Sequence, residues 1–231
     1  MRLDKFVAET LRISRKDAKL LIKKKQIQIN NQIINKDDYN VLLEQDNVMY
    51  LGEALHYEQY IYLVMNKPSG YVCARVDKLN KTVMELVPNC YLTKDLTIVG
   101  RLDVDTEGVL ILTNDGALVH NLTSPNHEVY KTYYVEYSGK LINNSKDLVE
   151  KGIPIDDYIT KPARLEEVDE GVAYITICEG KFHQVKKMFQ HLGTKVTYLK
   201  RVKFDIITLE NLSIGSIRKL TEEEIKILKG K

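Results

Sequence analysis

The chain has 231 residues, of which 44% are hydrophobic and 29% charged, and its formal net charge is +2. This composition is ordinary for a globular protein, and the length allows one large domain or a small one plus a medium one. No apolar run approaches the roughly 20 residues that span a bilayer. The charged N-terminus lacks the apolar centre of a signal peptide, so we expect a cytoplasmic protein without a membrane anchor.

The cysteines and the absence of nucleotide-binding motifs limit the chemistry further. Cys73, Cys90 and Cys178 are scattered, odd in number and without Cys-x-x-Cys spacing, which favours neither a disulfide framework nor a zinc site. The sequence also contains no P-loop and no Gly-x-Gly-x-x-Gly motif. We therefore expect no metal and no cofactor.

Basic residues are concentrated in two stretches of this nearly neutral chain. Residues 1–36 hold ten Lys or Arg against three Asp or Glu, and residues 181–204 hold seven Lys or Arg and no acid. Such local patches indicate a defined binding site for a polyanion rather than general attraction to one.

The N-terminal stretch is predicted to begin with two helices. Residues 3–11 repeat apolar side chains at the 3.6-residue spacing of a helix. Ser14 is a predicted N-cap for a second helix, with Asp17 at the position of a capping-box acid. Ala18 to Ile22 carry the apolar stripe of this second helix, and the residues between are basic, so its opposite face is predicted to be cationic.

A small sheet should follow these helices. Residues 26–29 alternate with a period of two, which predicts a half-buried strand, and Asn30-Asn31 predicts a tight turn. We place a small αα-β domain at residues 1–55 and a polar linker at residues 52–59. A domain of this size buries little surface, so we expect it to be tethered to a larger one.

Residues 60–231 are predicted to form a larger α+β domain. Strand patterns occur at residues 60–65, 97–99, 109–113, 132–137, 172–178 and 196–209, and helical patterns at residues 182–192 and from residue 221 onward. The segment Lys67-Pro68-Ser69-Gly70 is predicted to be a loop, and Asn114-Asp115-Gly116 a turn.

The densest polar cluster, residues 100–108, lies between two apolar runs. One interpretation is a solvated hairpin. A second is a calcium loop, because Asp103, Asp105 and Glu107 follow the EF-hand spacing, but Asn114 replaces the final acid and the flanks are strand-like. A third is a catalytic loop, since polar groups held between core strands commonly carry function.

Four motifs, in order along the chain, give a resemblance to a known family. The sequence Gly-Arg-Leu-Asp-Val-Asp-Thr-Glu-Gly at residues 100–108 resembles the signature of the pseudouridine synthases, in the branch typified by RsuA. Residues 67–70, Lys131-Thr132-Tyr133 and residues 179–188 also match that family. Residues 2–30 resemble the RNA-binding domain named after ribosomal protein S-four. The resemblance covers nearly the whole chain.

This resemblance implies a fold and a function. It implies an α+β protein, with an RNA-binding domain at residues 1–55 and a mixed, mainly antiparallel-sheet catalytic domain at residues 60–231. The implied reaction is the isomerisation of uridine to pseudouridine in ribosomal RNA, in particular 16S rRNA and by resemblance its uridine at position 516. The implied partner is ribosomal RNA or a ribosomal subunit precursor, and we expect a monomer without an obligate protein partner.

The resemblance also assigns roles to particular residues. It makes Asp103 the catalytic carboxylate, which either attacks C1′ of the ribose or takes the C2′ proton. It pairs Lys186 with Asp103 and stacks Tyr133 on the target base, although Tyr133 could simply be a half-buried strand residue. Arg101 is expected to help position the flipped nucleotide or its phosphate. Lys67 matches by position alone and is assigned a substrate-binding or supporting role; the alternative is a solvated loop lysine, which is usual before proline.

The cationic residues of the N-terminal domain are the expected RNA contacts, and they fit RNA by shape and phosphate rather than by base sequence. An ordinary solvated helix face is the alternative. The family usually has glycine where this chain has Lys25 and Asn31, which leaves the local turn geometry open. The residues expected to contact RNA are Arg2, Arg12, Arg15, Lys16, Lys19, Lys23 and Lys24.

Two other functions remain open at this point. The chain could be a large-subunit rRNA pseudouridine synthase, because related branches carry nearly the same motifs. It could also be a non-catalytic RNA-binding or ribosome-assembly protein with a degenerate second domain, although such a protein would not need the intact Asp103 motif. A calcium-dependent or glycosidase-like enzyme is disfavoured by the basic surroundings of that motif.

Overall fold

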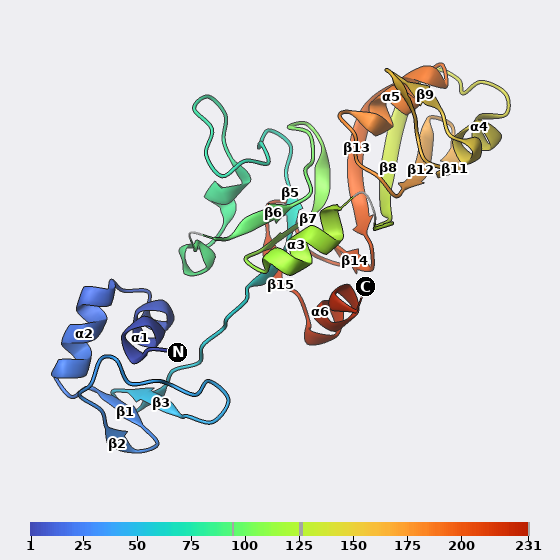
Figure 1. Cartoon of the computed structure of the whole chain (residues 1–231). Coiled ribbons are helices and arrows are strands. Elements are labelled where there is room, and N and C mark those ends of the chain that lie inside the picture. Colours follow the sequence, from blue (N-terminus) through green and yellow to red (C-terminus); the bar gives the residue numbers. More distant parts are fainter. Residues whose placement is uncertain (94, 125–126, 231) are drawn as a thin grey trace. The chain divides into compact units, whose positions relative to one another are not determined.

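The computed structural model describes residues 1–93, 95–124 and 127–230. The chain divides into two compact units, Met1–Gln59 and Tyr60–Lys231, whose elements are labelled in Figure 1. Each unit has its own buried apolar core. No helix in these described ranges is both long and apolar enough to cross a membrane.

The first unit contains two helices and a four-stranded antiparallel sheet in the order β2-β1-β3-β4. Ser14 caps the second helix as predicted, since its hydroxyl accepts a hydrogen bond from the backbone N–H of Asp17. Phe6 and Ile22 pack into the core that the helices share with the sheet. The elements are α1 (Leu3–Leu11), α2 (Arg15–Lys23), β1 (Ile27–Ile29), β2 (Gln32–Ile33), β3 (Val48–Tyr50) and β4 (Glu53–Ala54).

Lys25 and Asn31 are among the residues of this unit that adopt the left-handed backbone conformation. The φ angle is 60° at Lys25 and 66° at Asn31, the two positions where the family usually has glycine. Asparagine tolerates this conformation, whereas for lysine it costs about 1 kcal/mol. Both positions therefore adopt a backbone conformation that glycine would adopt without strain.

Much of the segment that we expected to be a linker belongs to the first unit. Glu53–Ala54 form β4, Leu55 packs against the core, and the ring centroid of Tyr57 lies 5.8 Å from that of Phe6. The linker prediction was wrong for these residues, because Leu55 and Tyr57 alternate with polar neighbours and bury one face.

The second unit is built on a nine-stranded sheet with the main path β11-β12-β8-β13-β7-β5-β15, to which β14 and β6 add. A separate two-stranded sheet pairs β9 with β10. The strands are β5 (Tyr62–Lys67), β6 (Thr97–Val99), β7 (Glu107–Thr113), β8 (Lys131–Ser138), β9 (Pro154–Ile155), β10 (Tyr158–Ile159), β11 (Arg164–Asp169), β12 (Val172–Ile177), β13 (Lys195–Phe204), β14 (Ile207–Thr208) and β15 (Ile217–Lys219). The predicted mixed, mainly antiparallel α+β fold is confirmed.

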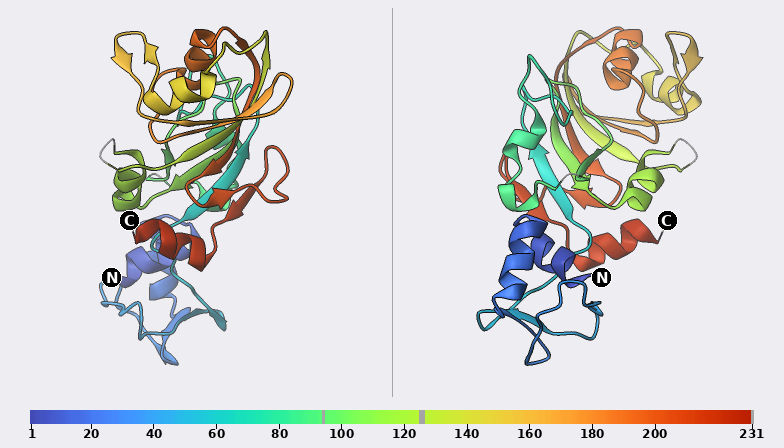
Figure 2. Two further views of the ribbon diagram at one scale, coloured as in Figure 1. Left: turned by 90° about the vertical axis from the view of Figure 1, so that its right-hand side faces the viewer. Right: turned by 60° about the vertical axis from the view of Figure 1, so that its left-hand side comes forward.

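Four helices and two 3-10 turns accompany these strands. The last helix carries its predicted capping box at Thr221 and Glu224. Helix α3 (Gly116–Thr123), the first helix of this unit, was not predicted. Its N-cap is Asp115, which we assigned to a turn and whose carboxylate accepts a hydrogen bond from the N–H of Leu118. This helix contacts the last one (Figure 2). The helices are α3 (Gly116–Thr123), α4 (Ser145–Lys151), α5 (Gln184–His191) and α6 (Glu222–Lys229), and the 3-10 turns are η1 (Val83–Leu86) and η2 (Asn89–Tyr91).

One parallel pairing fixes the polar motif against the middle of the sheet. In it, β13 pairs with β7 so that Arg201 lies opposite Gly108. A Cβ atom added at Gly108 would lie 2.1 Å from the backbone oxygen of Arg201, and the φ angle of Gly108 is 111°. Only glycine fits such a close approach. The last residue of the motif is therefore glycine for a steric reason.

Candidate active site

The polar motif forms the loop that connects β6 to β7. The side chain of Asp103 in this loop is 27% exposed. Lys67 at the end of β5 is fully buried, and its Nζ donates hydrogen bonds to the backbone oxygens of Asp103 (3.0 Å), Val104 (3.3 Å) and Thr106 (2.8 Å). The alternative interpretation of Lys67 as a solvated loop lysine is therefore wrong. One ammonium group bound to three carbonyls fixes the path of the loop around Asp103.

Lys186 on α5 faces two carboxylates of this loop. Its Nζ lies 3.2 Å from Oδ2 of Asp103 and 2.6 Å from Oδ1 of Asp105. Partial burial acts to lower the pKa of Lys186, but the hydrogen bond that it donates to Asp105 and the charge of Asp103 outweigh burial and raise that pKa. Lys186 is therefore a firmly charged partner of both acids.

Asp105 forms the shorter of the two ion pairs of Lys186. Burial acts to raise the pKa of Asp105, but its hydrogen bond to Lys186 and the charge of that lysine lower it overall. The side chain of Asp105 is 64% exposed, against 27% for Asp103. Asp103 is thus the more enclosed of the two carboxylates that Lys186 binds.

The residues just before α5 complete the surroundings of Asp103. His183 is the N-cap of α5, with a φ angle of 53°, and its Nε2 lies 3.6 Å from Oδ1 of Asp103. The ring of Phe182 stacks on His183 at a centroid distance of 3.8 Å and is 74% exposed. The helix begins at Gln184, two residues later than predicted. An exposed aromatic ring therefore lies beside the carboxylate, which no sequence pattern indicated.

A cleft of about 850 Å³ brings the predicted catalytic residues together. Arg101 and Asp103 from the polar loop, Tyr133 from β8 and Lys186 from α5 all line it. Tyr133 is only 7% exposed and also packs into the apolar core. This volume suits a nucleotide-sized ligand. Lys67 supports the loop and is not among the lining residues.

The calcium interpretation of the motif does not fit this geometry. Among the described residues, no group of three or more His, Cys, Asp or Glu side chains is placed to hold a metal ion. Asp105 is bound to Lys186, and Glu107 accepts a hydrogen bond of 2.6 Å from the hydroxyl of Tyr198. The carboxylates of the EF-hand pattern are therefore engaged by a cation and a phenol.

In the first unit a buried acid gathers basic side chains. Asp4 is fully buried; Arg2 and Arg15 donate hydrogen bonds to its carboxylate, and Nζ of Lys19 lies 3.7 Å from it. The hydrogen bond from Arg2 is the largest cause that holds the pKa of Asp4 well below its usual range, with that from Arg15 also contributing. The buried charge fixes three cations on the surface of α1 and α2.

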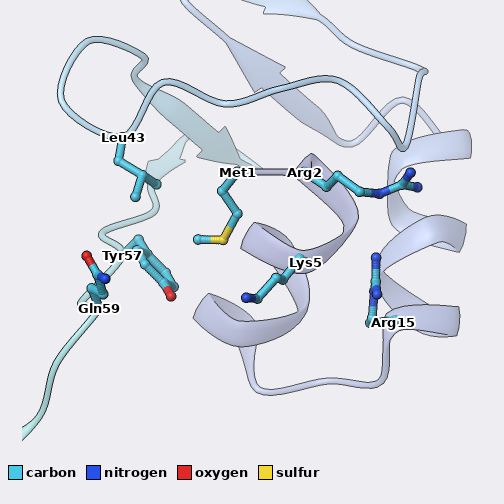
Figure 3. Close-up of a pocket in the computed structure, with 7 residues that line it drawn as sticks. All are labelled: Met1, Arg2, Lys5, Arg15, Leu43, Tyr57 and Gln59. Atoms are coloured by element: carbon cyan, nitrogen blue, oxygen red, sulfur yellow. The ribbon is translucent and has the colours of Figure 1, made fainter. Parts of the chain in front are cut away.

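A pocket of about 420 Å³ adjoins these cations (Figure 3). It combines guanidinium and ammonium groups with a tyrosine ring, which are the groups that bind phosphate and stack on bases. The lining residues are Met1, Arg2, Lys5, Arg15, Leu43, Tyr57 and Gln59. Of the predicted RNA contacts, Arg2 and Arg15 line this pocket, and Arg12, Lys16, Lys23 and Lys24 are exposed elsewhere on the same unit.

The fold and the cleft together define an enzyme that acts on RNA, and comparison with known proteins makes this specific. The model of the RNA pseudouridylate synthase family matches residues 61–191, and that of the S4 domain matches residues 1–48. The chain therefore belongs to the RNA pseudouridylate synthase family.

Individual relatives agree over the full length of the chain. It is 40% identical to an uncharacterized RNA pseudouridine synthase of Bacillus subtilis, over 99% of this chain and 98% of that protein. It is 38% identical to ribosomal small subunit pseudouridine synthase A of Escherichia coli, over 97% and 98%. A crystal structure of a pseudouridylate synthase superposes with a TM-score of 0.69 at 38% identity, covering 99% of each chain.

Proposed function

We propose that this pseudouridine synthase modifies 16S ribosomal RNA and that Asp103 is its catalytic carboxylate. The observation that carries the proposal is the cleft in which Asp103, paired with Lys186, shares one surface with Tyr133. The choice of 16S rRNA rests on relatives described as ribosomal small subunit pseudouridine synthases. By the same resemblance, the target is the uridine at position 516.

The reaction needs an ionised carboxylate beside the ribose. The bond between uracil N1 and ribose C1′ breaks, the base turns, a bond forms between C5 and C1′, and the C5 proton is replaced by one at N1. Asp103 acts either by attack on C1′ or by removal of the C2′ proton, which is later returned. In both cases Lys186 keeps the carboxylate oriented and stabilises its charge.

Two further residues of the cleft position the nucleotide in this proposal. Tyr133 lines the same cleft as Asp103 and stacks on the flipped uracil, which must remain bound while it turns. Arg101 is an exposed residue of the polar loop that lines the cleft, and it contacts the flipped nucleotide or its phosphate. Lys67 acts indirectly, because it holds the loop backbone that carries Asp103.

The first unit delivers the RNA. Its cations lie on α1 and α2 and around the pocket beside Tyr57, so they bind ribosomal RNA or a ribosomal subunit precursor through phosphates. We propose that the enzyme works as a monomer without an obligate protein partner, as the sequence led us to expect.

Release of tritium from 16S rRNA labelled at C5 of uridine tests the activity and the role of Asp103. The wild-type protein should release tritium, and the Asp103→Asn variant should be slower by at least ~10²-fold. Asp105→Asn is the matched control, because it removes the other carboxylate bound to Lys186 and should retain activity. Equal losses in the two variants would remove Asp103 from its proposed role.

The target is tested separately by mapping pseudouridine in rRNA from cells that lack this protein. The proposal expects one site to lose the modification, in 16S rRNA at position 516. Loss of a site in the large-subunit RNA would instead assign the enzyme to that substrate, and the assignment of Asp103 would be unaffected.

A further inference from the structure

Two basic residues on the sheet face of the cleft have no part in the mechanism above. Lys131 on β8 and Arg201 on β13 both line the cleft. Arg201 lies opposite Tyr133 in the pairing of these strands, and Lys131 precedes Tyr133 by two residues. Residues that are opposite, or two apart, share one face of a sheet. Both cations therefore lie beside the residue proposed to stack on the target base.

Arg201 is buried with part of its hydrogen-bonding capacity unused. Its side chain is 1% exposed; Nε donates a hydrogen bond of 2.8 Å to the backbone oxygen of Val109, and Cζ lies 4.9 Å from the ring centroid of Phe204. Its Nη2 is buried and has no hydrogen-bond partner among the described protein groups. A buried, unpaired guanidinium nitrogen is costly, so its presence at a cleft requires an explanation.

Lys131 adds a second cation to the same place. Its Nζ donates a hydrogen bond of 2.7 Å to the backbone oxygen of Val129 and lies 5.4 Å from the same Phe204 ring. Within the described parts of the chain, no carboxylate forms an ion pair with it. Burial, followed by the charge of Arg201, lowers the pKa of Lys131 to about 8. The two cations thus repel each other in a poorly solvated site.

Two acids act on Lys131 without offsetting the effects of burial and of Arg201 on its pKa. Glu179 and Asp205 act on Lys131 only through space and raise its pKa less than burial and Arg201 lower it. Glu179 also accepts hydrogen bonds from the N–H of Lys161 and from Nε2 of Gln184. The site keeps an excess of positive charge on the cleft wall.

The backbone holds this charge in a fixed position. The close approach of β7 to β13 at Gly108 sets the strand that carries Arg201, and the bond to Val109 orients the guanidinium group. A preorganised cation binds an anion without first giving up conformational freedom. The geometry therefore favours a ligand over a mobile surface contact.

We propose that Lys131 and Arg201 form an anion-binding subsite that takes a backbone phosphate of the RNA segment carrying the target uridine. The proposal rests on the proposed function, since it concerns the substrate of the same cleft. Guanidinium groups match the oxygens of a phosphate, and RNA supplies a phosphate next to every base. A phosphate held here, with the uracil on Tyr133, would keep the flipped nucleotide at two points.

A second source of negative oxygen is the uracil itself, whose carbonyl oxygens gain charge when the N1–C1′ bond breaks. The two sources differ in when the interaction forms. A phosphate is charged before the reaction and contributes to binding and to its salt dependence. Charge on the base develops only during the reaction and contributes to kcat.

The test compares Arg201→Met and Lys131→Met with Lys203→Met, which changes an exposed basic residue on β13 that does not line the cleft. Binding to an unmodified 16S rRNA transcript is measured at several salt concentrations, in the Asp103→Asn background so that no turnover occurs. Each cleft variant should weaken binding about tenfold and lower the slope of log K against log [salt] by about 0.7. Lys203→Met should change the RNA affinity and the salt slope less than the cleft variants do.

Thermal stability separates this role from a structural one. Removing a half-buried cation that no carboxylate pairs with in the described structure should raise the Tm of Lys131→Met by roughly 2–4 °C while RNA binding weakens. Arg201→Met loses a bond to the sheet and can unfold, in which case Lys131→Met decides. A lower Tm with unchanged RNA affinity would assign Lys131 to the fold and overturn the proposal.

Kinetics separate the remaining outcomes. With Asp103 intact, kcat at saturating RNA should stay within about threefold of wild type in Lys131→Met, because a contact made equally before and during the reaction affects KM. A tenfold drop in kcat with an unchanged salt slope would place the charge on the base and overturn the phosphate assignment. Wild-type protein that binds the transcript but releases no tritium would defeat the proposed function, and the binding data would still test the subsite.

Discussion

At the scale of single residues, the chemistry of the cleft depends on one lysine shared by two acids. Nζ of Lys186 is closer to Asp105 than to Asp103, by 2.6 Å against 3.2 Å. A cation shared by two carboxylates binds each of them less tightly than it would bind one alone. Asp103, the carboxylate that we propose to react, is therefore held by Lys186 less tightly than it would be as a sole partner.

The first prediction concerns this lysine. Lys186→Met should lower kcat by about 10²-fold, because it removes the charge that stabilises Asp103, while the Kd for RNA changes less than about threefold. Tritium release measures the change in kcat, and RNA binding by the same preparation measures the change in Kd. Lys187→Met is the control, since Lys187 pairs with Asp156 and does not line the cleft. Equal effects of the two substitutions would indicate a general loss of basic surface instead.

A second prediction uses the pKa of Lys131, which lies near 8 in the folded protein and higher in the unfolded chain. The groups that act on it are Arg201, which lowers its pKa after burial, and Cys178, Glu179 and Asp205, which raise it. Between pH 8 and 10 the unfolded chain binds more protons than the folded one. The contribution of Lys131 to the unfolding free energy should therefore rise with pH in this window.

The affinity for RNA should fall as Lys131 loses its proton, whereas the contribution of Lys131 to the unfolding free energy rises. As pH increases from 7 to 9, Lys131 loses its proton and its attraction for an anion, so RNA affinity should fall by up to about tenfold. Binding curves of wild type and Lys131→Met over this range provide the measurement. The variant should lack that part of the decline. Parallel curves for the two proteins would mean that another group titrates.

At the scale of helices and strands, the sequence predicted elements whose local signal is strong. The capping residues Ser14 and Thr221 and the period-two strands appear where they were expected. Helix α3 was missed because its turn-like start, Asn114 to Gly116, is also a helix cap, and eight residues give too few turns to establish a period. Helix α4 is shorter still.

The site was predictable only where a motif carried it. Asp103, Tyr133 and Lys186 came from the family resemblance, whereas Arg201 had only a general signal, an acid-free basic stretch from residue 181 to residue 204. Its burial depends on the parallel pairing of β13 with β7, which joins segments nearly a hundred residues apart. No local pattern reports such a contact. Lys67 was misjudged for the same reason.

A third prediction belongs to the turn after α2. Lys25→Gly should stabilise the first unit by about 1 kcal/mol, since lysine is strained at its φ of 60° and glycine is not. Lys24→Gly is the matched control, because Lys24 has an ordinary φ of −74° and glycine there gains nothing. Hydrogen exchange of the amides in α2 and β1 of the full-length protein measures the change. Slower exchange in Lys25→Gly alone is the expected outcome.

At the scale of the whole molecule, we propose that the two units divide the work of recognition. The first presents cations at α1 and α2 that are fixed in part by the buried Asp4. The second places its acids and cations inside a cleft. Phosphate contacts of the first unit should therefore dominate the affinity for long RNA, and the cleft should decide which nucleotide reacts.

The last prediction tests this division by salt dependence. Replacing Lys16, Lys23 and Lys24 of α2 with Gln should lower the slope of log K against log [salt] by about 2–3 for a structured rRNA fragment, since each lost phosphate contact releases about one counterion fewer. These lysines are exposed, and the described basic partners of Asp4 are other residues, Arg2, Arg15 and Lys19, so the fold should be retained. The control replaces Lys140, Lys146 and Lys151, three exposed lysines of the second unit, with Gln.

The two triple variants have the same net charge, so any difference between them reflects the position of the cations. Turnover of the α2 variant should return at high RNA concentration, because α2 contributes to KM and the cleft is unchanged. If both variants lower the slope equally, RNA is attracted by total charge, and α2 is an ordinary solvated face. If only the α2 variant does so, the first unit is the part of the enzyme that holds the RNA while the cleft selects its uridine.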